Sequence, residues 1–83
     1  MATTDYSINS GDGWVKVSDD GVDFIMENKS RVATVKYTFA SSAPSAGAPY
    51  HRVRPDDFAI RAGAPGDCYI SVDSADDVTV TVS

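Results

Sequence analysis

The sequence predicts an all-β protein, a small antiparallel β-sandwich or barrel of jelly-roll or immunoglobulin-like type with seven or eight strands. The composition is the first reason, because ten Val, four Ile, six Thr and eight aromatic residues stand in 83 positions without a single Leu. β-Branched and aromatic side chains favour strands, whereas the strong helix formers Leu, Gln and Glu are nearly missing. The second reason is an apolar–polar alternation of period two, and the third is a turn signal about every ten residues.

A chain of this length forms one domain, and we expect a single β-domain over residues 6–83 after an N-terminal tail at residues 1–5. Its core is thin, since Leu, Ile, Val and Phe together supply 17 of the 83 residues. Small domains with thin cores are often stabilised by association, so the composition favours an oligomer.

In the first third of the chain, strands are expected over 6–9, 14–18 and 22–27, with turns at 10–13 and 19–21. The second turn contains Asp-Gly between two apolar runs, which is a strong hairpin signal. The side chains expected to face the core are those on one phase of each alternation, Val15, Val17, Val22, Phe24 and Met26.

The clearest alternation runs over 31–40, where Ala33, Val35, Tyr37 and Phe39 take one face. A period of two over eight residues indicates a strand and excludes an amphipathic helix. The segment 41–49 (SSAPSAGAP) has no periodicity, and its Pro and Gly content predicts a long exposed loop.

Four more strands are expected over 50–54, 58–61, 68–72 and 78–82, the first two separated by the turn Pro55-Asp56-Asp57. The alternation directs three residues of each of the last two strands inward: Cys68, Ile70, Val72, Val78, Val80 and Val82. Because one cysteine cannot form an internal disulfide, Cys68 is interpreted as a small core residue, with an intermolecular or reactive thiol as the alternative.

The net charge of −5 and a pI of about 4.4 argue against nucleic acid and anionic membranes as partners, because both are negatively charged. The first ten residues have neither the basic nor the apolar region of a signal peptide, and no apolar run is long enough to span a bilayer. We therefore expect the chain to be made in a cytoplasm.

The sequence carries no recognisable catalytic set, which predicts a protein that is not an enzyme and needs no cofactor. One Cys and one His cannot build a structural zinc site, and no G-x-S-x-G motif is present. His51 as the general base of a small hydrolase remains a minor alternative. Most of the eleven Asp fall in predicted turns, where their carboxylates bond nearby backbone N–H groups; calcium binding is the other reading of this pattern.

Six residues are candidates for an interaction surface. Trp14 and Tyr50 fall on the faces opposite the expected core, although a one-residue change of phase would bury Trp14 instead. The other four make up the basic patch of an acidic chain and include three of its four Arg: His51, Arg52, Arg54 and Arg61. Arginine is enriched at protein interfaces, but pairing with turn aspartates within the chain is the favoured role.

The order of sequence motifs over residues 14–82 resembles that of a known class of proteins. It runs from W-V-K-V through F-I-M-E-N-K-S, V-A-T-V-K-Y-T-F-A, S-A-P-S-A-G-A-P and R-V-R-P-D-D to G-D-C-Y-I-S-V-D-S and V-T-V-T-V-S. This resembles small proteins encoded in the structural gene modules of tailed bacteriophages. Those proteins have an Asn-containing strand end, a Pro-rich loop, a Pro-Gly-Glu-like turn, a Gly-x-x-Tyr/Trp motif and a Val-rich last strand. Here Pro55-Asp56-Asp57 stands where many relatives have Pro-Gly-Glu.

The resemblance implies a non-enzymatic virion protein that binds the major capsid protein or another virion protein as a decoration or cement protein, or that forms part of a fibre or tail. Such a protein is made in the host cytoplasm and resides in the virion. Closed symmetry, with a trimer as the simplest guess, is expected. The alternative is a carbohydrate- or receptor-binding module, suggested by Trp14, Tyr50 and Tyr6.

Overall fold

Residues 3–45 and 47–83 are described by a computed structural model, and they form eight β-strands and one short 3₁₀ turn. The strands are β1 Thr4–Ile8, β2 Val15–Ser18, β3 Phe24–Asn28, β4 Val35–Ala40, β5 His51–Val53, β6 Phe58–Arg61, β7 Asp67–Val72 and β8 Val78–Val82. The 3₁₀ turn η1 covers Ser10–Asp12. Within this part of the chain, no helix is long and apolar enough to cross a membrane.

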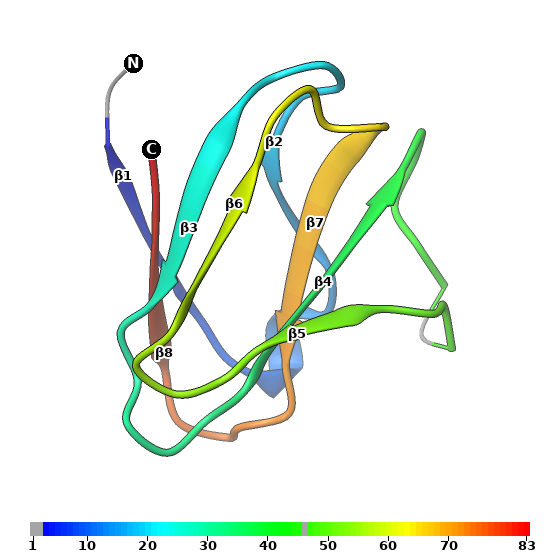
Figure 1. Ribbon diagram of the computed structural model, residues 1–83. Helices are drawn as coiled ribbons and strands as arrows, with labels where there is room; N and C mark the ends of the chain where they lie inside the picture. The colour runs from blue at the N-terminus through cyan, green and yellow to red at the C-terminus, as the bar shows by residue number, and fades with distance from the viewer. Residues whose placement is uncertain (1–2, 46) are drawn as a thin grey trace.

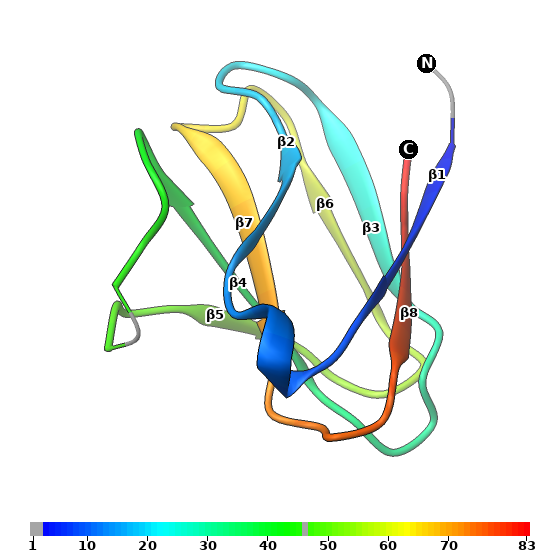
Figure 2. The same cartoon turned by 180° about the vertical axis from the view of Figure 1, so that it is seen from behind.

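The strands form two antiparallel four-stranded sheets, with the orders β1-β8-β3-β6 and β2-β7-β4-β5 (Figure 1). The two sheets stack as a sandwich and do not close into a barrel, so the predicted all-β class is confirmed and the barrel alternative is not observed. Figure 2 shows the sandwich from behind, with the first strand β1 beside the last strand β8.

The strand pairs are nested in the sequence: β4 with β5, β3 with β6, β2 with β7 and β1 with β8. The chain thus folds like one long hairpin that is wrapped into two layers. This is the connectivity of a jelly roll, whereas an immunoglobulin-like sandwich keeps hairpin-linked neighbours together in one sheet.

The core contains no Leu and is filled mainly by Val and Ile from both sheets. Its buried apolar side chains are Ile8, Val17, Phe24, Met26, Val35, Val53, Ala64, Cys68, Ile70, Val72, Val78, Val80 and Val82. The inward phase predicted for β8 and for the even positions of β7 is confirmed, as is the buried position of Cys68. β7 lies in the middle of its sheet and is buried on both faces, because Tyr69 and Ser71 are covered as well.

Several strand boundaries differ from the sequence-based prediction by one to four residues, and the starts of β1 and β4 are among them. β1 begins at Thr4, because Thr4 and Asp5 pair with the last strand opposite Val82 and Thr81, so these two residues of the expected tail belong to the sheet. The expectation for residues 1–2 lies outside the described residues. β4 begins at Val35, four residues after the predicted start.

The late start of β4 has a local cause. The Ser30 hydroxyl accepts hydrogen bonds from the backbone N–H groups of Val32 and Ala33, at 3.2 and 2.9 Å. These donors are therefore used in a turn and are not available to a strand ladder. Val32 is left 91% exposed, although the alternation placed it within the strand.

The 3₁₀ turn η1 replaces the simple turn expected at residues 10–13. It is closed by a capping box, in which the Asn9 side chain accepts from Gly11 N–H and the Asp12 carboxylate accepts from Asn9 N–H, both at 2.9 Å. The turn places Trp14, at the start of β2, against the outer face of the second sheet.

Candidate binding surfaces

Trp14, Lys36 and Tyr50 come from three separate segments and meet on the outer face of the β2-β7-β4-β5 sheet. Lys36 Nζ lies 5.8 Å from the Trp14 ring centroid and 5.2 Å from the Tyr50 ring centroid. The same ammonium group is 2.9 Å from Asp73 Oδ1. The Trp14 indole N–H donates to the Ser45 carbonyl at 3.1 Å, which fixes the ring against the Pro-rich loop. Two cation–π contacts and an ion pair thus hold one lysine in place.

A hollow of about 500 Å³ opens beside Trp14. It is bounded by η1 on one side and by the loop between β4 and β5 on the other, and its lining comprises Ser10, Gly13, Trp14, Lys36, Ala43, Pro44, Ser71, Val72 and Asp73. An aromatic face, hydroxyl groups, an ammonium and a carboxylate therefore border one space. This mixture can contact a polar ligand through hydrogen bonds and its apolar side by stacking.

The six predicted interface residues do not all lie together in the structure. Trp14 and Tyr50 border the lysine, and Arg52 lies opposite Lys36 in the β4–β5 register, on the same outer face. Trp14 is half-buried and packs against Lys36, outside the cluster of core residues.

His51 and Arg61 lie apart from this group, in a row of aromatic side chains. The His51 ring is 5.3 Å from the Tyr37 ring, and the Arg61 guanidinium is 5.7 Å from the Phe39 ring. Arg54 follows β5 and is exposed. Within residues 3–45 and 47–83, every ion pair is made by a lysine, and none joins these arginines to a turn aspartate.

An exposed apolar face on the other sheet is a feature that the sequence reasoning missed. Ile25 on β3 and Ile60 on β6 are directly opposite each other, and they are 49% and 67% exposed. Phe58, two residues before Ile60 and on the same face, is 59% exposed. The available signal was that Ile25 occupies the outward phase of its strand and that Phe58 and Ile60 share one phase of theirs.

The remaining outward positions of this sheet are polar. The half formed by β1 and β8 presents Asp5, Ser7, Thr79 and Thr81. The Thr81 hydroxyl donates to the Asp5 carboxylate at 2.7 Å. The apolar side chains are thus confined to the half formed by β3 and β6, the strand at the sheet edge. Exposed apolar clusters of this kind mark interaction sites more often than isolated apolar residues do.

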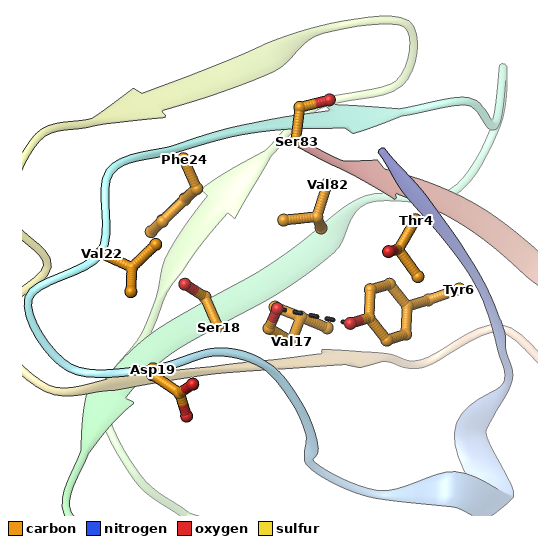
Figure 3. Close-up of a pocket in the computed structure, with 9 residues that line it drawn as sticks. All are labelled: Thr4, Tyr6, Val17, Ser18, Asp19, Val22, Phe24, Val82 and Ser83. Atoms are coloured by element: carbon orange, nitrogen blue, oxygen red, sulfur yellow. Dashed lines mark hydrogen bonds between the residues drawn. The ribbon is translucent and has the colours of Figure 1, made fainter. Parts of the chain in front are cut away.

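A second hollow lies between the two sheets, on the side where β1 and β2 are the edge strands (Figure 3). Its volume is about 230 Å³, and Figure 3 shows Tyr6, Val17, Phe24 and Val82 around it. The Tyr6 hydroxyl donates to the Val17 carbonyl at 3.4 Å and so bridges the two layers. Asp19 is the only ionisable side chain besides Tyr6 in its lining, so the hollow has no acid–base pair for catalysis.

Two residues were candidates for chemical reactivity, His51 as a general base and Cys68 as a thiol. His51 lines neither of these two hollows. Burial raises the pKa of the Cys68 thiol to about 12, which leaves it protonated and unreactive at neutral pH. The hydrogen bond to Asp19 raises the pKa of Lys16, an exposed surface amine.

The aspartates serve mainly as turn residues. The carboxylates of Asp67, Asp23 and Asp57 accept from the backbone N–H groups of Asp20, Gly63 and Phe58. Among residues 3–45 and 47–83, no three His, Cys, Asp or Glu side chains are grouped so that they could hold a metal ion.

Comparison with known proteins adds no relative: no family model, no curated protein and no solved structure matches this chain. Function is therefore argued from the surfaces themselves.

Proposed function

We propose that the chain is a non-enzymatic structural protein of a bacteriophage virion, which binds the capsid surface as a decoration protein and acts as an oligomer. The observation that carries this proposal is the exposed apolar face formed by Ile25, Phe58 and Ile60. Burial of such side chains against a partner contributes about 25 cal/mol per Å² of apolar area removed from water. A protein with a thin core gains further stability when its folded form is bound to a lattice.

The fold supports the proposal by analogy only. Jelly rolls occur in viral capsid proteins and in lectins, and the same fold serves unrelated functions. The phage-like order of sequence features favours a structural role over a catalytic one.

Co-sedimentation with capsids of the encoding phage, stripped of this protein, tests the proposal. The wild-type chain should pellet with the capsids at saturable stoichiometry. Replacement of Ile25, Phe58 and Ile60 by Thr should weaken binding by about tenfold or more, because the apolar contact area is lost. The control Thr79→Ser changes the polar half of the same face and should bind as the wild type does. Wild-type chain that stays in the supernatant would refute the proposal.

The hollow beside Trp14 favours a second function, binding of a carbohydrate by a fibre or tail module. The specific observation is the junction of Trp14, Tyr50 and the Lys36–Asp73 pair at one site. Stacking on an aromatic face combined with hydrogen bonds to charged groups suits a ligand that is apolar on one side and rich in hydroxyls on its edge.

Tryptophan fluorescence reports on this hollow directly, since Trp14 is the only tryptophan. Titration with a panel of oligosaccharides should change the emission, and Tyr50→Ala should abolish the response. The control Phe58→Ala, on the opposite sheet, should leave it unchanged. A glycan array without hits, together with constant emission, would eliminate the carbohydrate function.

A further inference from the structure

Strand β6 presents a free backbone edge. Ile25 exchanges both of its main-chain hydrogen bonds with Ser83, at 3.0 and 2.9 Å, on the side of β3 that faces β8. Ile25 therefore cannot bond to Ile60 opposite it, and the ladder between β3 and β6 uses Ala59 and Arg61. The N–H and C=O groups of Phe58 and Ile60 consequently point away from β3, towards the open edge.

This edge combines free backbone groups with apolar side chains. Phe58 and Ile60 stand on the outer face and are more than half exposed, while Ala59 and Arg61 lie on the face that looks towards the other sheet. An exposed apolar edge strand is a template for pairing with another strand. The Asp57 carboxylate accepts from the Phe58 N–H at 2.8 Å, so one edge donor is occupied in the isolated chain.

We infer that two copies of this chain pair through β6, antiparallel, about a twofold axis at Ala59. In this register Phe58 lies opposite the partner's Ile60, and Ile60 opposite the partner's Phe58. These are the residues whose backbone groups point outward, so each pair exchanges two hydrogen bonds across the axis. Asp57 lies opposite the partner's Arg61, and its carboxylate leaves the Phe58 N–H for that guanidinium.

The self-complementarity of the edge identifies the occupant as a second copy. The four residues Asp57, Phe58, Ile60 and Arg61 run acid, apolar, apolar, base around Ala59, so reversing the strand places opposite charges together and apolar residues together. A twofold axis brings the same surface of both subunits into contact, which a strand of this pattern satisfies. Charge pairs of this kind fix register and orientation.

Neighbouring registers satisfy the edge less well. With the axis at Ile60, Phe58 faces the partner's Ala62 and Asp57 faces the partner's Gly63, so both charge pairs are lost. With the axis at Phe58, Ile60 faces the partner's Asp56, which places an acidic residue against an apolar one. The register about Ala59 is the one that uses both outward residues and both charges.

The dimer joins the β1-β8-β3-β6 sheets of the two copies into one continuous eight-stranded sheet. Ile25, Phe58 and Ile60 of both copies then form a single apolar stripe across the twofold axis. This pairing does not depend on the proposed virion role, because it follows from the edge alone.

Sedimentation equilibrium of the purified chain over a wide concentration range tests the inference. The mass should rise to twice the 8.8 kDa of one chain. Arg61→Asp places two acids opposite each other and should raise the dissociation constant by about tenfold or more. The double variant Asp57→Arg with Arg61→Asp restores opposite charges and should recover dimerisation, while the control Arg54→Asp should dimerise as the wild type does. Circular dichroism should verify that each variant is folded.

A chain that stays monomeric at all concentrations, a trimer, or a double variant no better than Arg61→Asp would overturn the inference. Disulfide trapping then checks the register. Ala59→Cys places two thiols across the axis at a non-hydrogen-bonded pair, where the Cα atoms are about 4.5 Å apart and a disulfide can form. Ile60→Cys places the two thiols at diagonal positions of the ladder, each opposite the other copy's Phe58, and should not cross-link. Cross-linking of Ile60→Cys in place of Ala59→Cys would refute the register.

Discussion

Asn28 is fully buried at the end of β3, and its side chain holds three segments together. Its amide nitrogen donates to the carbonyls of Ala33, Val53 and Arg54, at 2.7, 3.1 and 3.2 Å, and its carbonyl accepts from the Ser30 N–H at 2.9 Å. A single polar residue thus ties the turn before β4 to the end of β5. This gives a physical reason for an asparagine at a strand end, the feature on which the phage resemblance partly rests.

Asn28→Ala should lower the free energy of unfolding by about 3 kcal/mol, because buried carbonyls and one N–H lose their partner. Urea denaturation measures the change. The control Asn9→Ala removes the exposed cap of η1 and should cost about 1 kcal/mol. A smaller loss for Asn28→Ala than for Asn9→Ala would show that the buried network is not what stabilises this end of the sandwich.

Cys68 provides a pH-dependent prediction. The pKa of its thiol is about 12 in the folded chain, against an ordinary value of 9.0, because burial disfavours the thiolate. Below pH 9 the thiol is protonated in both states, and its contribution to stability is complete. Above pH 9 the unfolded chain releases the proton and the folded chain does not, so stability falls as the pH rises towards 12, by about 1.4 kcal/mol per pH unit.

Urea denaturation of the wild type and of Cys68→Ala from pH 8 to pH 11 measures this contribution. Other groups titrate in the same range in both proteins, so the difference between the two slopes isolates the thiol. Cys68→Ala should be less stable at pH 8, owing to the cavity, and should lose stability more slowly above pH 9. Equal slopes of stability against pH for the two proteins would show that burial does not raise the pKa of the Cys68 thiol.

At the scale of elements, β4 and β7 approach each other closely where Gly66 precedes β7. A Cβ atom at Gly66 would lie 3.2 Å from the backbone nitrogen of Ala40, the last residue of β4. Gly66→Ala should therefore destabilise the fold by about 1 kcal/mol or more, because the strands must move apart. Thermal unfolding checks this, and Gly47→Ala is the matched control.

The control lies in the loop between β4 and β5, where nothing comes within 4 Å of the added carbon. Its stability should stay within about 0.5 kcal/mol of the wild type. A loss that is equal for the two variants would mean that close approach is not the reason for glycine at position 66.

Most individual elements are predictable from this sequence, because alternation and turn chemistry act within a few residues. The Val-Thr alternation of β8 and the apolar phase of β3 lead directly to their buried faces. Asp56 has a φ of 57°, a left-handed conformation that glycine adopts without strain and that Asp tolerates better than most other residues do. The extension of the turn beyond Ser30 was missed, since the Ser30 hydroxyl binds the N–H groups of Val32 and Ala33 in a way that periodicity does not register.

The surfaces are less predictable, because they depend on which strands become neighbours. Trp14, Lys36 and Tyr50 meet only because β2, β7, β4 and β5 are adjacent in that order, and Lys36 was not among the expected residues. The apolar pair Ile25 and Ile60 likewise requires the β3–β6 pairing. Nothing local in the sequence specifies either arrangement.

For the whole molecule, the nested pairing predicts slow folding. Only β4 and β5 are consecutive strands that pair, and β1 must find β8 at the other end of the chain. Closing long loops before their contacts form costs entropy, so folding should take about milliseconds to seconds rather than microseconds. Stopped-flow dilution from urea, followed by Trp14 fluorescence, measures the rate. Relaxation within microseconds would contradict a folding barrier set by this topology.

The antiparallel pairing of β1 with β8 brings Thr4 opposite Val82, next to both ends of the chain. A tensile force applied at these ends would act across the ladder and open its hydrogen bonds one after another, in the manner of a zipper, instead of shearing them all at once. The sandwich should therefore yield at low load when it is pulled from its ends. The sandwich should resist a much higher force when the load is applied through another surface than when it is applied at the two ends.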